Sequence, residues 1–194
     1  MTALPLLAIF VGGSSRRMGR DKGLLLVPGG SEPIVEALVR RGRAAGLDPV
    51  LVGDAAPYAR LAAGVTRVDD EPLGAGPLAG LHAAARYALE HGGSHDVAVA
   101  CDMPYVTTEA LVQTCAHSSA AVVVAPQRGP GAPWEPMLAR YDAAQLVDVL
   151  ADAISQGTRS FQHLFASIEV EALPLTPAIE RALEDWDTPD DIAR

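Results

Sequence analysis

Residues 4–22 read LPLLAIFVGGSSRRMGRDK, an apolar run that ends in two glycines and passes into a basic loop. A continuous apolar run of this length predicts a parallel strand over Leu4–Val11 that is buried on both faces. Adjacent glycines after such a strand let backbone N–H groups approach a phosphate closely. The stretch therefore predicts an α/β fold with an anion-binding loop after its first strand.

Strand and helix signals alternate along the rest of the chain. Further extended segments are predicted at Leu24–Val27, Pro49–Val52, Val65–Val68, Asp96–Ala100, Ala120–Ala125, Pro136–Tyr141 and Ile168–Leu173. Helices are predicted at Pro33–Ala45 (with Ser31 as its cap), Pro57–Ala63, Pro77–His91, Asp142–Gln156, Phe161–Ala166 and Pro189–Arg194. A further helix is predicted to begin after a cap at Thr107 or Thr108 and to end near Ala116. This alternation predicts one domain over residues 1–194, a three-layer α/β fold whose mostly parallel sheet carries helices on both faces.

Composition and charge narrow the functional classes. The net charge is −9 and no run of Lys and Arg exceeds two residues, which argues against a nucleic-acid groove. The two cysteines, Cys101 and Cys115, form no CxxC motif, as expected in a reducing compartment. Leu4–Val11 is too short to span a bilayer and has no basic segment before it. We therefore expect a cytoplasmic protein that binds neither membrane nor nucleic acid.

The loop Gly12–Lys22 concentrates much of the positive charge that an acidic protein needs to hold a polyanion. Its cations are Arg16, Arg17, Arg20 and Lys22. The loop is not a Walker A motif, because five residues separate Gly13 from Gly19 and Lys22 follows three residues later. On composition alone, a phosphate cradle and a basic tight turn are equally good interpretations.

The order of residues in the loop favours the phosphate cradle over the basic tight turn. The pattern GGxSxRMGxDK in Gly12–Lys22 resembles the signature loop of the MobA-like nucleotidyltransferases, most closely that of molybdenum cofactor guanylyltransferases. Four further segments resemble the family in the same order: Gly76–Gly80, Cys101–Pro104, Glu135–Leu138 and Asp187–Asp191. The resemblance spans nearly the whole chain and implies a Rossmann-like nucleotide-diphospho-sugar transferase fold of the GT-A type.

The resemblance also implies a nucleotide site. Contacts to the base and sugar would come from Phe10, Val11, Gly12, Gly13 and Gly53, where Gly53 replaces the asparagine of the guanylyl enzymes. Lys22 would contact the phosphates and Arg17 would hold the leaving pyrophosphate. Asp70 matches an aspartate associated with nucleotide binding, although its neighbour Asp69 is an alternative one position away.

A metal site and an acceptor site follow from the same resemblance. Asp102 matches the metal-binding aspartate of the family, and Asp187 is the candidate second ligand for Mg²⁺, with Mn²⁺ as the alternative ion. A turn or helix-cap aspartate is the structural alternative for Asp102. Gly76, Pro77 and Gly80 are the candidate acceptor-binding residues, and close packing of a helix on the sheet is an equally good interpretation of these three. Trp134 has two interpretations, stacking on a pterin or packing.

The reaction implied is transfer of GMP from GTP to the phosphate of molybdopterin, with release of pyrophosphate. A phosphate nucleophile is anionic at neutral pH, so the catalytic residues Arg17, Lys22 and Asp102 have to supply charge neutralisation and not a strong base. Transient contact with molybdenum cofactor biosynthesis or delivery proteins is expected. Cytidylyl transfer from CTP is the nearest alternative, since Gly53 and Asp187 depart from the guanylyl pattern. A sugar-1-phosphate nucleotidyltransferase and a non-catalytic nucleotide-binding delivery protein are the others.

Overall fold

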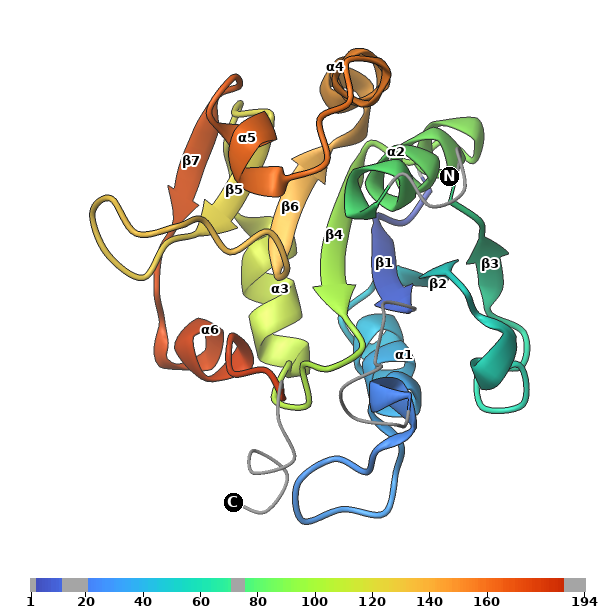
Figure 1. The fold of residues 1–194 in the computed structure, drawn as a ribbon. Helices are drawn as coiled ribbons and strands as arrows, with labels where there is room; N and C mark the ends of the chain where they lie inside the picture. The colour runs from blue at the N-terminus through green and yellow to red at the C-terminus, as the bar shows by residue number, and fades with distance from the viewer. Residues whose placement is uncertain (1–2, 12–20, 71–75, 187–194) are drawn as a thin grey trace.

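The computed structural model describes residues 3–11, 21–70 and 76–186, and its centre is a seven-stranded sheet in the order β3-β2-β1-β4-β6-β5-β7 (Figure 1). The strands are β1 (Leu6–Val11), β2 (Asp48–Gly53), β3 (Thr66–Val68), β4 (His95–Ala100), β5 (Val123–Pro126), β6 (Ala139–Asp142) and β7 (Val170–Leu173). β6 runs antiparallel to its neighbours β4 and β5, and the other neighbouring strands are parallel. The predicted mostly parallel sheet is confirmed.

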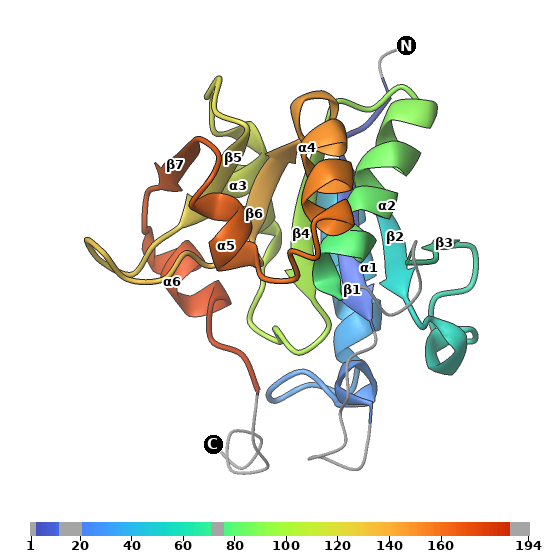
Figure 2. The same ribbon diagram turned by 45° about the horizontal axis from the view of Figure 1, so that its top comes forward.

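Helices cover both faces of this sheet. They are α1 (Ile34–Ala44), α2 (Pro77–Glu90), α3 (Thr108–Ala116), α4 (Ala143–Ser155), α5 (Phe161–Phe165) and α6 (Pro177–Ala182), with short 3₁₀ turns η2 (Lys22–Leu24) and η3 (Ala56–Tyr58). Buried residues of α1, α3 and α6 share one apolar cluster, whereas those of α2, α4 and α5 fall in clusters on the other face. Figure 2 shows α2 and α4 side by side in front of the sheet.

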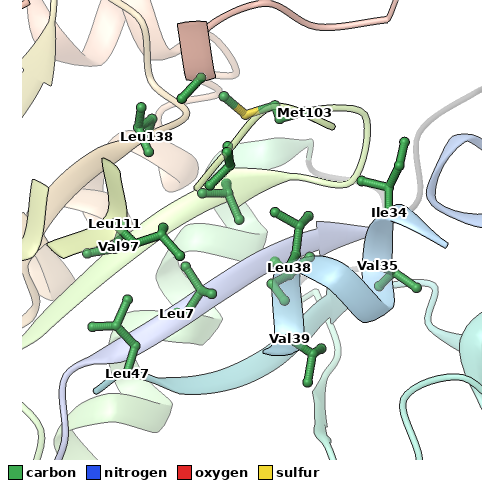
Figure 3. Packing of buried hydrophobic residues seen from close by; sticks show 14 of the residues in the cluster. Leu7, Ile34, Val35, Leu38, Val39, Leu47, Val97, Met103, Leu111 and Leu138 are labelled. Carbon is green, nitrogen blue, oxygen red and sulfur yellow. The ribbon is translucent and has the colours of Figure 1, made fainter. Parts of the chain in front are cut away.

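Alternate side chains of β1 build both layers of the core. Leu7 and Ile9 join the cluster beneath α1 and α3, and Leu6 and Ala8 join the cluster beneath α2. Figure 3 shows Leu7 close to Leu38 of α1 in the first layer. Because both faces are buried, the strand carries no polar residue, which is why its sequence is a continuous apolar run.

Two predicted elements differ from the structure. Leu24–Val27 is not a strand of the sheet: η2 ends at Leu24, and Leu26 then makes an isolated bridge with Pro33. Ser31 does not cap α1, whose N-cap is Pro33. The segment predicted as the helix Pro57–Ala63 contains only η3 and turns, and it buries Tyr58. In both segments local apolar spacing was outweighed by turn-forming proline and glycine residues nearby.

The C-terminal part contains a helix that the sequence analysis missed. Thr176 caps α6 by accepting a hydrogen bond from the Ile179 N–H, and Pro177 occupies the first helical position. The predicted turn Pro189–Arg194 lies outside the described residues. None of the described helices is both long enough and apolar enough to cross a membrane.

Candidate functional site

The carboxyl ends of six strands meet at one edge of the sheet. β1, β2, β3 and β4 are mutually parallel, and β5 and β7 run in the same direction because each relates to β4 through the antiparallel β6. Ligands of open α/β sheets bind outside this edge. β1, β3 and β4, which precede the three segments that the sequence analysis singled out, all end at this edge, at Val11, Val68 and Ala100.

A half-buried ion pair stands at the edge. Nζ of Lys22, at the start of η2, donates a hydrogen bond of 2.9 Å to Oδ2 of Asp102, which follows β4. The side chains are 14% and 22% exposed, so water screens the pair only in part. The sequence analysis expected Lys22 at the phosphates and Asp102 at the metal ion, and the structure brings the two side chains together.

Tyr58 packs behind this pair. A Cβ built on Gly23 would lie 2.8 Å from Cε1 of the Tyr58 ring and 3.2 Å from Cβ of Cys101. The Tyr58 hydroxyl and the Cys101 thiol influence each other's ionisation, and both side chains lie against Gly23. Burial raises the pKa of Tyr58 well above its usual range and, with the charge of Asp102, raises that of Cys101 to about 11. Both groups are therefore neutral linkers, and neither is a nucleophile at neutral pH.

The loop that carries Asp102 is fixed from two directions. Nη1 of Arg41, on α1, donates to the carbonyl oxygens of Pro104 at 3.0 Å and Val106 at 2.6 Å. The Trp186 N–H donates to the Asp102 carbonyl oxygen at 3.0 Å. This second bond brings the end of the described chain to the same loop, one residue before Asp187.

A second group of predicted residues converges on Gly80 of α2. A Cβ there would lie 3.0 Å from Oδ1 of Asp70 and 3.0 Å from Cε1 of Phe10. It would also lie 2.9 Å from Cγ1 of Val52. Burial, and then the charge of Asp69, raise the pKa of the Asp70 carboxyl. Phe10, Asp70 and Gly80 thus form one contact group, in which a glycine permits the close approach.

Two other predicted glycines have backbones that favour glycine. Gly53 has φ of +96°, and a Cβ there would lie 2.4 Å from the Val11 carbonyl oxygen. Gly76, the N-cap of α2, has φ of +89° and lies beside the α4–α5 connection, with its Cβ position 3.9 Å from the Arg159 carbonyl oxygen. Pro77 occupies the first turn of α2, as predicted.

Several predicted site residues cannot be placed. Gly12, Gly13, Arg17 and Asp187 lie outside the described residues. Val11 ends β1 and pairs with Gly53. Within residues 3–11, 21–70 and 76–186, no group of three or more His, Cys, Asp or Glu side chains is placed to hold a metal ion.

The sequence analysis missed the supporting residues Tyr58, Arg41 and Gln162. Each contacts a segment that is distant in sequence. Gln162, for example, forms a hydrogen bond with the backbone of Trp134. The sequence does show a tyrosine and an arginine within apolar segments, and polar groups that become buried there require hydrogen-bond partners. The partners themselves depend on the tertiary fold.

Comparison with known proteins gives consistent matches. Residues 7–170 match the MobA-like NTP transferase domain. The chain is 32% identical to a probable molybdenum cofactor guanylyltransferase of Opitutus terrae, covering 95% of this chain and 91% of the relative. It is 33% identical to a protein of the same name in Synechococcus elongatus, covering 87% of each.

A solved structure shares the fold. The crystal structure of molybdopterin-guanine dinucleotide biosynthesis protein A from Archaeoglobus fulgidus superposes with a TM-score of 0.75 at 25% identity. The match covers 96% of this chain and 94% of that one. The predicted nucleotidyltransferase fold is confirmed over nearly the whole length.

Proposed function

The chain belongs to the MobA-like NTP transferase family and is a nucleotidyltransferase, and from this premise we propose that it transfers GMP from GTP to the phosphate of molybdopterin. An oxygen of the acceptor phosphate attacks the α-phosphorus of GTP. The bond from that phosphorus to the bridging oxygen of the β-phosphate breaks, and pyrophosphate leaves. The names of the relatives support the choice of GTP and molybdopterin.

The observation that carries the proposal is the contact between Lys22 and Asp102. The lysine closes the signature loop and the aspartate follows β4, so a cation and an anion meet where parallel strands end. Transfer between two polyanions needs both, because the ammonium attracts phosphate oxygens and the carboxylate holds a divalent ion. No strong general base is required, since the nucleophile is already charged.

Asp102 fits a Mg²⁺ site in which the phosphates of the bound nucleotide supply further ligands. Mg²⁺ uses one or two protein carboxylates and takes its remaining ligands from phosphate and water. The Asp102 side chain is partly exposed and held through one oxygen by Lys22, so a single carboxylate at the edge suffices for a metal–nucleotide complex. Bound Mg²⁺, or Mn²⁺ in its place, would neutralise phosphate charge, and Asp187 is the proposed second ligand.

Phe10 and Asp70 are proposed to contact the nucleoside, together with Val11, Gly12, Gly13 and Gly53. Their support is the shared position of Phe10, Asp70 and Gly80 at the ends of β1, β3 and the first turn of α2. Lys22 and Arg17 are proposed to hold the phosphates. Gly76, Pro77 and Gly80 are proposed to face the acceptor from the N-terminal turn of α2.

Gly53 favours a second candidate, cytidylyl transfer from CTP. Its positive φ and the 2.4 Å approach of the Val11 carbonyl oxygen leave no room for the asparagine that contacts the base in the guanylyl enzymes. Any base contact here would come from the backbone, which discriminates less sharply between guanine and cytosine than a side chain does.

The experiment is a donor comparison with the purified protein, molybdopterin and Mg²⁺. GTP, CTP and ATP are supplied separately, pyrophosphate release is measured, and the dinucleotide product is identified by mass spectrometry. We expect the highest kcat/KM with GTP, and we expect GTP with Mg²⁺ to raise Tm most. Higher kcat/KM with CTP would replace guanylyl by cytidylyl transfer, and no pyrophosphate release with any donor would contradict enzymatic transfer to molybdopterin.

A further inference from the structure

The loop Cys101–Thr107, between β4 and α3, contains turns but no helix or strand, so contacts with other elements have to fix its backbone. Pro104 and Val106 are buried in it, and buried carbonyl oxygens need hydrogen-bond donors. Nη1 of Arg41 donates to both carbonyl oxygens, at 3.0 and 2.6 Å, across more than 60 positions of the chain. One nitrogen of α1 thus holds the loop two and four residues beyond Asp102.

The same helix also supports the residue that pairs with Asp102. The Leu25 N–H donates to the Lys22 carbonyl oxygen at 3.0 Å, and the N–H of Ile34, the first residue of α1, donates to the Leu25 carbonyl oxygen at 2.8 Å. Arg41 lies about two turns further along this helix. Helix α1 is therefore a common frame for the segment that begins at Lys22 and for the loop that carries Asp102.

The support of the loop gains importance when the nucleotide binds. In the free protein, Nζ of Lys22 holds the Asp102 carboxylate at 2.9 Å. The proposed function assigns Lys22 to the phosphates, so this contact is lost in the complex. The carboxylate then depends for its position on the backbone of its loop, which Arg41 holds from one side and the Trp186 N–H from another. Residues that bind a metal need such support from the groups behind them.

We propose that Arg41 is a positioning residue for nucleotidyl transfer, which keeps the Asp102 carboxylate in place for the divalent ion of the bound nucleotide by holding the Pro104 and Val106 carbonyl oxygens. Arg41 acts through the loop and is assigned no contact with substrate or metal. This inference rests on the proposed function, in which Asp102 binds the ion. Loss of a group that supports a metal ligand lowers metal affinity or activity by about 10–100-fold.

Nucleotide binding with and without Mg²⁺ tests the role of Arg41 without turnover. Isothermal titration gives the Kd for GTP, or for CTP if this is the better donor, at saturating Mg²⁺ and in EDTA. Arg41→Met removes the donors and keeps an unbranched side chain in the helix. We expect it to raise the Kd at saturating Mg²⁺ by about tenfold or more and to leave the Kd in EDTA unchanged. Arg41→Lys, whose ammonium keeps several N–H donors, should retain most of the affinity.

Two control variants on α1 separate positioning from general stability. Val39→Ala, at a buried position, should lower Tm and leave both Kd values unchanged, because it removes no hydrogen bond to the loop. Arg43→Ala removes an exposed arginine of the same helix and should change neither Tm nor Kd. If Arg41→Met does not fold, Arg41→Gln, which is shorter and has a single amide donor, takes its place with the same expected rise in Kd.

A double-mutant cycle tests whether Arg41 acts through Asp102. Arg41→Met alone should lower kcat by about tenfold or more. In the Asp102→Asn background it should lower kcat no further, since the carboxylate that it positions is absent. Two effects that multiply would show that Arg41 supports a different group, and they would overturn the proposal.

The binding data also distinguish this inference from the proposed function. If Asp102→Asn weakens GTP binding at saturating Mg²⁺ and Arg41→Met does not, the metal site of the proposed function is retained and the positioning role of Arg41 is overturned. If Asp102→Asn leaves this Kd unchanged, both are overturned.

Discussion

Nζ of Lys22 lies 2.9 Å from Oδ2 of Asp102, although the two residues are 80 positions apart in the chain. If each takes its proposed partner, Lys22 a phosphate and Asp102 a divalent ion, the pair has to exchange this contact for two others when the nucleotide binds. In the free protein, the ammonium and the carboxylate compensate each other's charge. Both groups are then already in place when the phosphates and the divalent ion bind.

Lys22→Ala and Asp102→Asn should each lower turnover by about a hundredfold or more, the usual effect of removing a charge-stabilising group. Pyrophosphate release at saturating donor and acceptor is the measurement. Arg40→Ala removes an exposed ion pair, with Glu32, and is the matched control, since such pairs contribute little. Near-normal turnover in either site variant would contradict the assignment of the pair.

Gly80→Ala tests the contact group of Phe10, Asp70 and Gly80. Alanine is favoured in a helix by roughly 1 kcal/mol, but its Cβ would lie 2.9–3.0 Å from three neighbours, including Oδ1 of Asp70. Displacing them costs about 1–3 kcal/mol, so the net change in stability is small. The displacement falls on the proposed nucleoside contacts, and we expect the Kd for the donor to rise about tenfold.

Isothermal titration with donor and Mg²⁺ measures that Kd. Gly129→Ala is the control, because no atom lies within 4 Å of its Cβ position. An unchanged Kd in Gly80→Ala would place the nucleoside elsewhere.

Tyr58→Phe tests the support behind the ion pair. Removing the hydroxyl takes away its polar interactions with Cys101 and the Gly23 backbone, at a cost of about 1 kcal/mol in stability. Because Gly23 and Cys101 adjoin Lys22 and Asp102, we expect kcat to fall several-fold while the donor KM is unchanged. Tyr87→Phe removes an exposed hydroxyl that contacts Thr66 and should change neither. A change in Tm without a change in kcat would limit Tyr58 to folding.

The sheet and the proximity of Lys22 to Asp102 could be predicted from local sequence signals and one topological rule. The apolar run Leu4–Val11 and the glycine–proline start of α2 are local patterns, and parallel strands bring their carboxyl ends together, which places Lys22 near Asp102. Apolar spacing cannot show that β6 is inserted antiparallel between β4 and β5. The capping pair Thr176 and Pro177 was a local signal for α6 that was not used.

The supporting contacts could not be predicted from sequence. The Gln162 amide holds Trp134 across 28 positions, and Arg41 binds carbonyl oxygens more than 60 positions away. A polar side chain indicates that a partner exists, but many backbone groups have the same chemistry. Only the packed fold decides which of them is within 3 Å.

Asp96 gives the protein a pH-dependent stability that is independent of the site. The residue is fully buried on β4, and among the described residues neither of its carboxyl oxygens has a hydrogen-bond partner. Burial, and then the charge of Asp142, raise its pKa from 3.8 to about 7. The folded state therefore keeps the proton between these values, whereas the unfolded state has released it. The stabilisation is complete below pH 3.8 and is lost as the pH rises towards 7.

A difference of about three pKa units corresponds to roughly 4 kcal/mol. Urea unfolding of the protein and of Asp96→Asn at pH values from 4 to 8 should therefore show the free energy of unfolding of the native chain falling relative to the variant by about this amount. Asp48→Asn is a matched control, because Asp48 and Asp96 both pair with Leu6 in the sheet but Asp48 is exposed. Parallel pH profiles for the native chain and Asp96→Asn would show that Asp96 is ionised in the fold, with a partner that compensates for its burial.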